Sequence, residues 1–349
     1  MSFTSKPLRL GILGCANIAK QFVRDVTPSA AVQIVAVASR SAPTAAAFAA
    51  SLGIERHHGS YEALLADPEV DAVYVPLPNS LHAHWAIKAA ESGKHVLCEK
   101  PLATSLSEAQ RMFESAKRHG VVLLECLPHC FQPQTADMLA LLRDGAIGDV
   151  RSVQASFGFM LNNPTGNIRM APELGGGALL DTGSYAVNLI HLAMGVAPQR
   201  VTAEATWADA GVDINLTATL HYADGRRAQV SCAMDAANHR RATIIGSNGT
   251  IETEYLNHTS KQAGGHPYGY LPSQMRVRRG TANTIPFEDI HSETGSGFLF
   301  AAEALARMIV GGDADMLRAA NQASLDNAAT LEAIARSARL GQSVDVAPR

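Results

Sequence analysis

Two short segments carry side chains of the kind that transfer protons. Glu99-Lys100-Pro101 follows the apolar run His95–Cys98, and a proline after Lys100 disfavours helical backbone at the lysine. In the second segment Asp181 and Tyr185 are four residues apart, so both would lie on one face of a helix. An ammonium, a carboxylate and a phenol are among the side-chain groups that can act as general acids or bases. The alternatives are a Glu–Lys pair on a surface loop and an ordinary half-buried aromatic residue.

A glycine turn between the first apolar run and the first helical segment indicates nucleotide binding. The fingerprint G-x-G-x-x-G/A takes the form Gly14-x-Ala16-x-x-Ala19. Gly14 would permit the tight turn, and a small residue at 16 would let the backbone approach a pyrophosphate. Free N–H groups at the helix start, where Asn17 and Ile18 stand, would bind phosphates. Because Ala16 departs from the fingerprint, an ordinary strand-to-helix turn is the alternative.

The residues after the second apolar run bear on the choice between NAD and NADP. NAD sites usually carry an acidic residue about 20 residues past the glycines, but none occurs between Asp25 and Glu55. Arg40 stands there instead and could meet a 2′-phosphate, with Ser39 beside it as a donor. We therefore expect NADP, with NAD possible; a solvated loop arginine is the alternative.

Strands and helices alternate over the first 125 residues. Such alternation predicts βαβ units and a doubly wound parallel sheet of the Rossmann type, and continuously apolar strands fit a sheet covered on both faces. The expected strands are Arg9–Leu13, Val32–Ala38, Ala72–Val75, His95–Cys98 and Val121–Leu124. The expected helices are Ile18–Val26, Ala42–Leu52, Tyr61–Ala66, Leu81–Ser92 and Ser105–His119.

A different pattern begins after about residue 126. Longer strand-like runs separated by turn signals predict an α+β domain with a large, mostly antiparallel open sheet. The expected strands are Val150–Phe159, Arg200–Thr206, Ile214–Tyr222, Ala228–Met234, Ala242–Ile245 and Thr250–Glu254, and the expected helices are Thr135–Arg143, Ala178–Met194, Phe298–Ile309 and Met316–Leu340. The polar, Gly- and Pro-containing stretch Asn257–Pro286 is expected to be a long surface loop.

These patterns divide the chain into two predicted domains. Residues 1–125 would form an NAD(P)-binding domain, and residues 126–349 a domain for substrate binding and oligomerisation. The last helices could pack back on the first domain.

Composition limits the class of protein. The chain has 349 residues, of which 47% are hydrophobic and 17% charged, with a net charge of −3. This is too apolar for disorder and lacks the basic footprint of a nucleic-acid-binding protein. No apolar run approaches the roughly 20 residues of a membrane span, and the first residues lack a signal-peptide layout. Five scattered cysteines fit a reducing compartment, so we expect a cytoplasmic protein that binds neither nucleic acid nor membrane.

Metal and hydrolytic sites have little support in the sequence. His57-His58 and His82-x-His84 lack a carboxylate or cysteine set at ligand spacing, and Cys126 and Cys130 have no partner pair. No motif provides the paired carboxylates of a glycosidase. We therefore expect no metal.

Together, these segments resemble the glucose-fructose oxidoreductase / inositol dehydrogenase / MocA family. Glu99-Lys100-Pro101 is similar to the family's Glu-Lys-Pro signature, and Gly175 to Tyr185 is similar to its G-G-G-x-L-x-D-x-G-x-[HY] motif. Ala72 to His82 resembles the turn that lies along the nicotinamide side of the cofactor. The resemblance covers nearly the whole chain and implies a second domain whose open sheet is commonly used for dimers or pairs of dimers.

The resemblance implies hydride transfer between nicotinamide C4 and a carbinol or carbonyl carbon of a sugar or polyol. Lys100, Tyr185 and Asp181 would be catalytic: Tyr185, in place of the family's His, as acid or base, Lys100 to favour its phenolate, and Asp181 to orient the substrate or the lysine. Whether Lys100 or Tyr185 donates the proton stays open. The residues expected to bind the cofactor are Gly14, Ala16, Asn17, Ile18, Ser39, Arg40, Leu77, Pro78, Asn79, His82, Glu99 and Lys100.

Substrate contacts are expected from Arg169, Gln132, Asp181 and Tyr185. Gln132 stands where the family often carries a His before a Pro, and His129 is expected to be structural. The prediction is an NAD(P)-dependent oxidoreductase of a sugar or polyol, for example an aldose 1-dehydrogenase, with a trans-dihydrodiol dehydrogenase and a nucleotide-linked ketosugar reductase as alternatives. A non-catalytic nucleotide-sensing regulator is the alternative outside enzymes, although it would not need the acid–base set. The expected assembly is a homodimer or homotetramer through the second sheet.

Overall fold

The structure, a computed structural model, describes residues 6–262, 269–312 and 314–347. It divides into two compact units: unit 1 contains residues 1–127 and 298–324, and unit 2 contains residues 128–297 and 325–349. The chain therefore leaves unit 1, forms most of unit 2 and returns. Among the described residues, no helix is long and apolar enough to cross a membrane.

Unit 1 is built on a six-stranded parallel sheet with strand order β3-β2-β1-β4-β5-β6. This confirms the predicted Rossmann topology, in which ligands bind at the carboxyl ends of β1 and β4, where the strand order reverses. The strands are β1 (Leu8–Leu13), β2 (Val32–Ala38), β3 (Arg56–His58), β4 (Ala72–Val75), β5 (His95–Glu99) and β6 (Leu123–Cys126). The short strand β3 was not expected.

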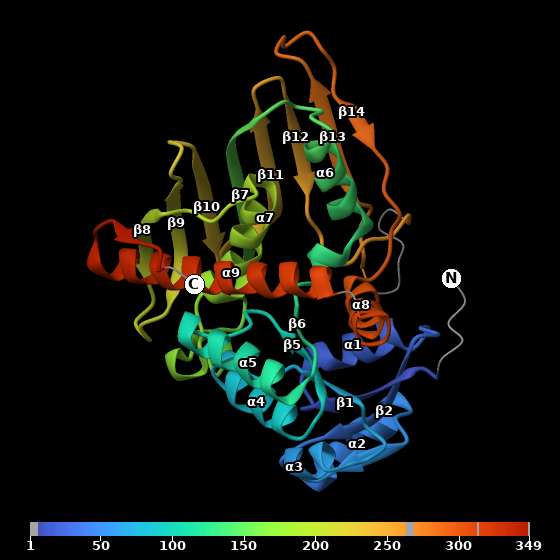
Figure 1. Cartoon of the computed structure of the whole chain (residues 1–349). Coiled ribbons are helices and arrows are strands. Elements are labelled where there is room, and N and C mark those ends of the chain that lie inside the picture. The colour runs from blue at the N-terminus through green and yellow to red at the C-terminus, as the bar shows by residue number, and fades with distance from the viewer. Residues whose placement is uncertain (1–5, 263–268, 313, 348–349) are drawn as a thin grey trace. The chain divides into compact units, whose positions relative to one another are not determined.

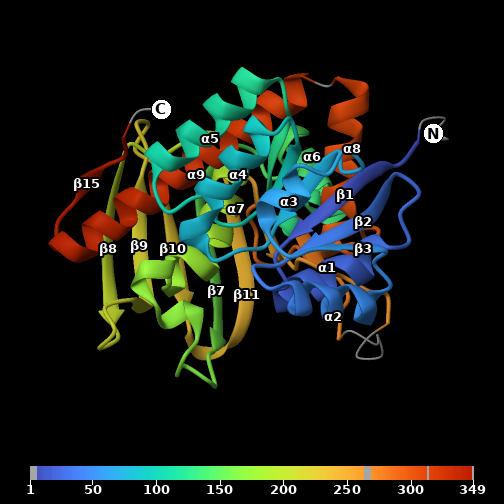
Figure 2. The same ribbon diagram turned by 90° about the horizontal axis from the view of Figure 1, so that it is seen from below.

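Helices cover both faces of this sheet, with α1 and α2 on one side and α4 and α5 on the other (Figure 2). Their bounds are α1 (Asn17–Val26), α2 (Ala42–Leu52), α3 (Tyr61–Leu65), α4 (His82–Glu91), α5 (Leu106–His119) and α8 (Gly297–Gly311). Every residue of β4 and β6 is buried, as a sheet covered on both faces requires. Phe298 of α8 adds to this core, since its ring lies 5.5 Å from that of Phe22.

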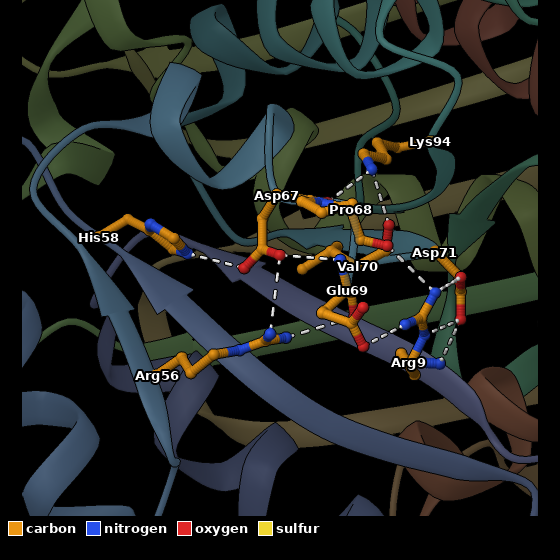
Figure 3. A network of polar contacts seen from close by, with 9 residues as sticks. All are labelled: Arg9, Arg56, His58, Asp67, Pro68, Glu69, Val70, Asp71 and Lys94. Atoms are coloured by element: carbon orange, nitrogen blue, oxygen red, sulfur yellow. Dashed lines mark hydrogen bonds and ion pairs between the residues drawn. The ribbon is translucent and has the colours of Figure 1, made fainter.

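A polar network fastens the amino ends of these strands (Figure 3). Arg9 at the start of β1 donates to both carboxylate oxygens of Asp71, which precedes β4, at 2.9 and 2.6 Å. Lys94, which precedes β5, donates to the carbonyls of Asp67 and Val70, at 2.8 Å each. Because the network lies at the sheet edge opposite the carboxyl ends, we interpret it as structural.

Unit 2 is built on a nine-stranded sheet with order β14-β13-β12-β11-β7-β10-β9-β8-β15. Only the pair β7–β10 is parallel among its described neighbours, so the predicted mostly antiparallel sheet is confirmed. The strands are β7 (Val150–Met160), β8 (Arg200–Trp207), β9 (Asp213–His221), β10 (Arg227–Ala233), β11 (Asp235–Gly246), β12 (Gly249–Glu254), β13 (Gln274–Arg279), β14 (Glu288–Ile290) and β15 (Val344–Asp345).

One face of this sheet is packed against helices and the other is polar. Helix α7 contacts β7 and β10. At the edge of the sheet, the Ser337 hydroxyl of α9 accepts from the Ala203 N–H of β8 at 3.0 Å. The helices are α6 (Pro133–Arg143), α7 (Ser184–Met194) and α9 (Ala314–Leu340), labelled in Figure 1. Helix α9 contributes to both units, because their division falls after Ser324.

Several details of unit 2 differ from the expectations, and the short strands β14 and β15 were not expected. The predicted loop Asn257–Pro286 contains strand β13 (Gln274–Arg279), in which Met275 and Val277 are buried between exposed polar residues; residues 263–268 of that loop lie outside the described part. Strand β11 begins at Asp235, seven residues before the expected Ala242. The expected helix Ala178–Met194 begins with a π-helical turn, Leu179–Gly183.

Candidate active site

The loop after β1 has the geometry of a phosphate-binding turn. Gly14 has φ +120°, a conformation that favours glycine, and a Cβ atom there would lie 2.9 Å from Leu77 Cδ2, so that side chain would have to shift. Ala16 stands at the N-cap position of α1, and no described side chain caps the helix. Asn17 and Ile18 at its start are exposed. Helix N–H groups not capped by a side chain favour an anion, so these residues fit a dinucleotide.

Ser39 and Arg40 follow β2 directly. The Ser39 N–H donates to the His58 carbonyl at 3.1 Å, which fixes the backbone at the end of the strand. Arg40 is exposed, and its charge opposes the effect of burial, which raises the pKa of the neighbouring Tyr61 phenol. A basic side chain therefore stands at the position where NAD sites usually carry an acid.

The turn after β4 and the loop after β5 are joined by His82. The turn carries the half-buried residues Leu77, Pro78 and Asn79. The His82 ring is fully buried, with Nδ1 2.9 Å from the Pro101 carbonyl and Nε2 2.8 Å from the Leu77 carbonyl. Only a protonated ring can donate to both, while burial lowers the pKa of His82. The side chain of His82 thus positions two loops, and its expected part in cofactor binding would be indirect.

Two carboxylates hold the loop that carries Lys100. The Tyr74 hydroxyl donates to Glu99 Oε1 at 2.5 Å, and the Lys100 N–H donates to Glu99 Oε2 at 3.3 Å. The Lys100–Pro101 peptide bond is cis. Glu125 Oε1 accepts from the Leu102 N–H at 2.8 Å, and burial raises the pKa of Glu125 to about 7. Glu99 is buried and acts here as a support for the half-buried Lys100.

In unit 2 the glycine motif lets a distant carboxylate cap the helical segment. Gly177 has φ +111°, and a Cβ atom there would overlap the Asp213 carboxylate. Asp213 accepts the Leu179 N–H at 2.6 Å, and burial raises the pKa of this carboxyl. Asp213, from β9, therefore fixes the start of the segment that carries Asp181 and Tyr185.

Asp181 forms an ion pair with Arg169. The Arg169 Nε donates to Asp181 Oδ2 at 2.5 Å; the arginine side chain is 40% exposed and the aspartate side chain 15%. The Gly177 N–H also donates to the Arg169 carbonyl at 2.9 Å. The structure thus brings together two residues that the sequence analysis had placed at the substrate.

Tyr185 lies in an aromatic and cationic environment. Its hydroxyl accepts from Asn257 Nδ2 at 3.2 Å, and the Arg240 guanidinium carbon lies 4.3 Å from the ring centroid. The rings of Phe157 and His129 lie 5.4 and 5.7 Å away. His129 is fully buried, and burial together with the Arg240 charge holds its pKa well below the usual value. Both effects favour the neutral form of the His129 ring.

Gln132 occupies a different environment from the one expected. The side chain is 3% exposed, and its Nε2 donates to the Asn257 and Gly295 carbonyls at 2.6 and 2.9 Å. Its Oε1 accepts from the Thr259 hydroxyl at 3.3 Å. Because the amide is occupied by groups of unit 2, we replace the expected substrate contact with a role in holding the Asn257 segment.

Sequence reasoning missed Arg240, Asn257, Asp213 and Glu125. The sequence does contain a signal for Arg240. Side chains two residues apart in a strand lie on the same face, so Arg240 lies on the same face as the buried Ala242 and Ile244, where a charged residue is unusual. Because the expected strand began at Ala242, Arg240 was not placed in a strand and this alternation was not considered. Asn257 lies in an irregular segment, where no periodicity could indicate its role.

No group of three or more His, Cys, Asp or Glu side chains within the described ranges could hold a metal ion.

Comparisons with known proteins agree over both units. Residues 8–126 match the family model described as "Oxidoreductase family, NAD-binding Rossmann fold", and residues 135–252 match the GFO/IDH/MocA C-terminal domain. The chain is 35% identical to D-xylose 1-dehydrogenase (NADP(+)) 2 of Haloferax volcanii, over 97% of this chain and 100% of that protein. It is 32% identical to trans-1,2-dihydrobenzene-1,2-diol dehydrogenase of Danio rerio, over 87% and 89%.

A solved structure is similar over the same extent. The 3-ketoreductase KijD10 of Actinomadura kijaniata, in complex with NADP and TDP-benzene, superposes with a TM-score of 0.83 and 32% identity, covering 95% of this chain and 98% of that one. With the Rossmann sheet, the Glu99-Lys100 loop and the glycine motif in place, the chain belongs to the GFO/IDH/MocA family of oxidoreductases.

Proposed function

We propose that this oxidoreductase is an aldose 1-dehydrogenase that prefers NADP. One observation carries the proposal: exposed Arg40 follows β2, where NAD enzymes usually carry an acid, in a chain that matches an NADP-linked D-xylose 1-dehydrogenase over 97% of its length. The fit of the Gly14 turn to a dinucleotide supports it. The residues proposed to hold the cofactor are those of the three loops at the carboxyl ends of β1, β4 and β5, with Ser39 and Arg40 after β2.

The proposed chemistry needs a proton acceptor and a fixed oxygen. The bound cofactor would supply the hydride acceptor, nicotinamide C4. In the oxidative direction Tyr185 takes the proton of the sugar hydroxyl, and the Lys100 ammonium stabilises that oxygen as its charge develops. Asp181, kept ionised by Arg169, orients neighbouring hydroxyls. We assign the proton transfer to Tyr185 rather than Lys100, because its oxygen already accepts a hydrogen bond.

Steady-state assays test this proposal. Reduced-cofactor absorbance is followed with a panel of aldoses, a trans-dihydrodiol and a nucleotide-linked ketosugar, and we expect turnover of an aldose with NADP. Tyr185→Phe and Lys100→Ala should each lower kcat by about 10²–10⁴-fold. Tyr222→Phe is the matched control, since the buried Tyr222 hydroxyl has no hydrogen-bond partner among the described residues. Turnover of the dihydrodiol or the ketosugar alone would replace the aldose assignment.

We also propose a cytoplasmic homodimer formed through the polar face of the nine-stranded sheet. Support for the surface comes from a hollow of about 820 Å³ that lies over β7, β8, β9 and β10 and is lined largely by hydroxyl and amide side chains, such as Gln154, Thr217 and Gln229. Support for the compartment comes from the five cysteines, none of which forms a disulfide within the described part of the chain.

A further inference from the structure

The Arg240 guanidinium occupies an unusual place inside unit 2. Its carbon lies 4.3, 4.5 and 4.9 Å from the ring centroids of Tyr185, Phe157 and Tyr255. Its Nε is buried without a hydrogen-bond partner among the described residues. An arginine stays charged even where burial lowers its pKa, as it does here. The residue as a whole is half-buried, but a buried N–H of a cation left without a hydrogen bond is costly, which points to a role besides packing.

Asn257 connects this cation to the Tyr185 oxygen. Arg240 Nη2 donates to Asn257 Oδ1 at 2.9 Å, and Asn257 Nδ2 donates to the Tyr185 hydroxyl oxygen at 3.2 Å. A guanidinium has no acceptor, so the amide oxygen must face Arg240 and the amide N–H must face Tyr185. The Asn257 carbonyl is itself held by Gln132 Nε2 at 2.6 Å and the Gly297 N–H at 2.9 Å. The hydrogen bonds therefore run in one direction, from the Arg240 guanidinium to the Asn257 side-chain oxygen and from the Asn257 amide N–H to the Tyr185 oxygen.

This direction determines what the Tyr185 oxygen can do. Because it accepts from Asn257, its own proton is left to point to another acceptor. A hydrogen bond donated to a phenol oxygen, and a cation over its ring, both favour the phenolate over the neutral phenol. We propose that Arg240 and Asn257 are positioning residues that hold the Tyr185 oxygen as an acceptor and favour its phenolate, a role that rests on the proposed function of Tyr185 as the acid–base group.

Other titratable groups around this site do not supply the same effect. Burial and the Arg240 charge keep His129 neutral and lower the pKa of His258 to about 3. Burial raises the pKa of Tyr255. Asp181, one helical turn before Tyr185, is paired with Arg169. Arg240 is thus the cation that, within the described part of unit 2, lies over the Tyr185 ring.

The test is a tyrosine titration in the full chain without substrate. The ultraviolet phenolate signal of Tyr185, one of seven tyrosines, is isolated by subtracting the titration of Tyr185→Phe. Asn257→Asp keeps the acceptor for Arg240 but loses the donor to Tyr185, and Arg240→Met removes the cation. Each should raise the midpoint of the Tyr185 titration by about one pH unit or more. The pH at which kcat rises towards its alkaline plateau should increase by a similar amount.

Arg276→Met is the matched control, because Arg276 also stacks on an aromatic ring of unit 2, with its guanidinium carbon 4.5 Å from the Phe287 centroid. It should leave the Tyr185 midpoint unchanged. Circular dichroism checks that each variant is folded. If either Asn257→Asp or Arg240→Met is not folded, the Tyr185 midpoint of the other variant tests the inference. An unchanged Tyr185 midpoint in a folded variant would overturn the inference. A shifted midpoint in an enzyme that oxidises no aldose would overturn the proposed function instead.

Discussion

At the scale of single residues, we propose that Arg40 distinguishes NADP from NAD. Replacing it with alanine removes a charged donor worth about 1.5–3 kcal/mol when paired with an anion. We expect Arg40→Ala to raise the KM for NADP by about 10-fold or more and to leave the KM for NAD nearly unchanged, because NAD has no 2′-phosphate. Initial rates with each cofactor measure this. An equal rise in the KM for NADP and for NAD would contradict the proposed contact between Arg40 and the 2′-phosphate.

Glu125 links stability to pH through one carboxyl group. Its pKa is raised by burial from 4.5 to about 7, so folding takes up a proton between these values and stability falls as pH rises through that window. A shift of this size corresponds to about 3 kcal/mol. Glu125→Gln keeps the shape of the protonated form, so we expect its stability to change less with pH between 4.5 and 7.

Urea denaturation at a series of pH values measures the free energy of unfolding. Glu114→Gln, which changes an exposed glutamate on α5, should leave the profile parallel to that of the wild type. If the free energy of unfolding of Glu125→Gln also varied with pH in parallel with that of the wild type, the pH dependence would belong to other groups.

At the scale of elements, the start of the π-helical turn depends on Gly177. Alanine there would be strained at φ +111° and would displace the Asp213 carboxylate. Gly177→Ala should cost about 1–3 kcal/mol from backbone strain, with a further loss from the broken cap at Leu179. Gly211→Ala is the control, because Gly211 also has a positive φ but no atom within 4 Å of its would-be Cβ. Equal costs in thermal or urea unfolding would show that the Asp213 contact contributes nothing.

The elements themselves were predictable where one physical rule controlled them. Continuous apolar runs with glycine turns predicted strands β1, β2, β4, β5 and β6. Strand β13 was not predicted because its two buried residues, Met275 and Val277, alternate with Gln274, Arg276 and Arg278 in a polar stretch. The π-helical turn could not be predicted, since its cap, Asp213, lies 34 residues from Leu179. For the site, motifs indicated Lys100 and Asp181, but the supports around them come from tertiary contacts that have no local pattern.

At the scale of the whole molecule, the polar sheet face predicts the state of assembly. We expect the wild type to be a dimer, and Gln229→Arg combined with Thr217→Arg to yield monomers, because like charges would face each other across a twofold interface. Light scattering after size exclusion measures the mass. Ala223→Arg, in the exposed turn between β9 and β10, should leave the dimer intact. A monomeric wild type would contradict the proposed surface.

The return of residues 298–324 to unit 1 has an evolutionary consequence. Phe298 packs on Phe22 and Tyr74, and the Ser29 hydroxyl donates to Glu303 at 2.8 Å. A single genetic crossover that replaced residues 1–127 with those of a relative would separate Phe22, Ser29 and Tyr74 from Phe298 and Glu303. The new Rossmann sheet would then have to pack against an α8 helix from a different protein. New cofactor and substrate specificities in this lineage should therefore have arisen by point substitution, or by recombination at two places that carried α8 along with the Rossmann sheet.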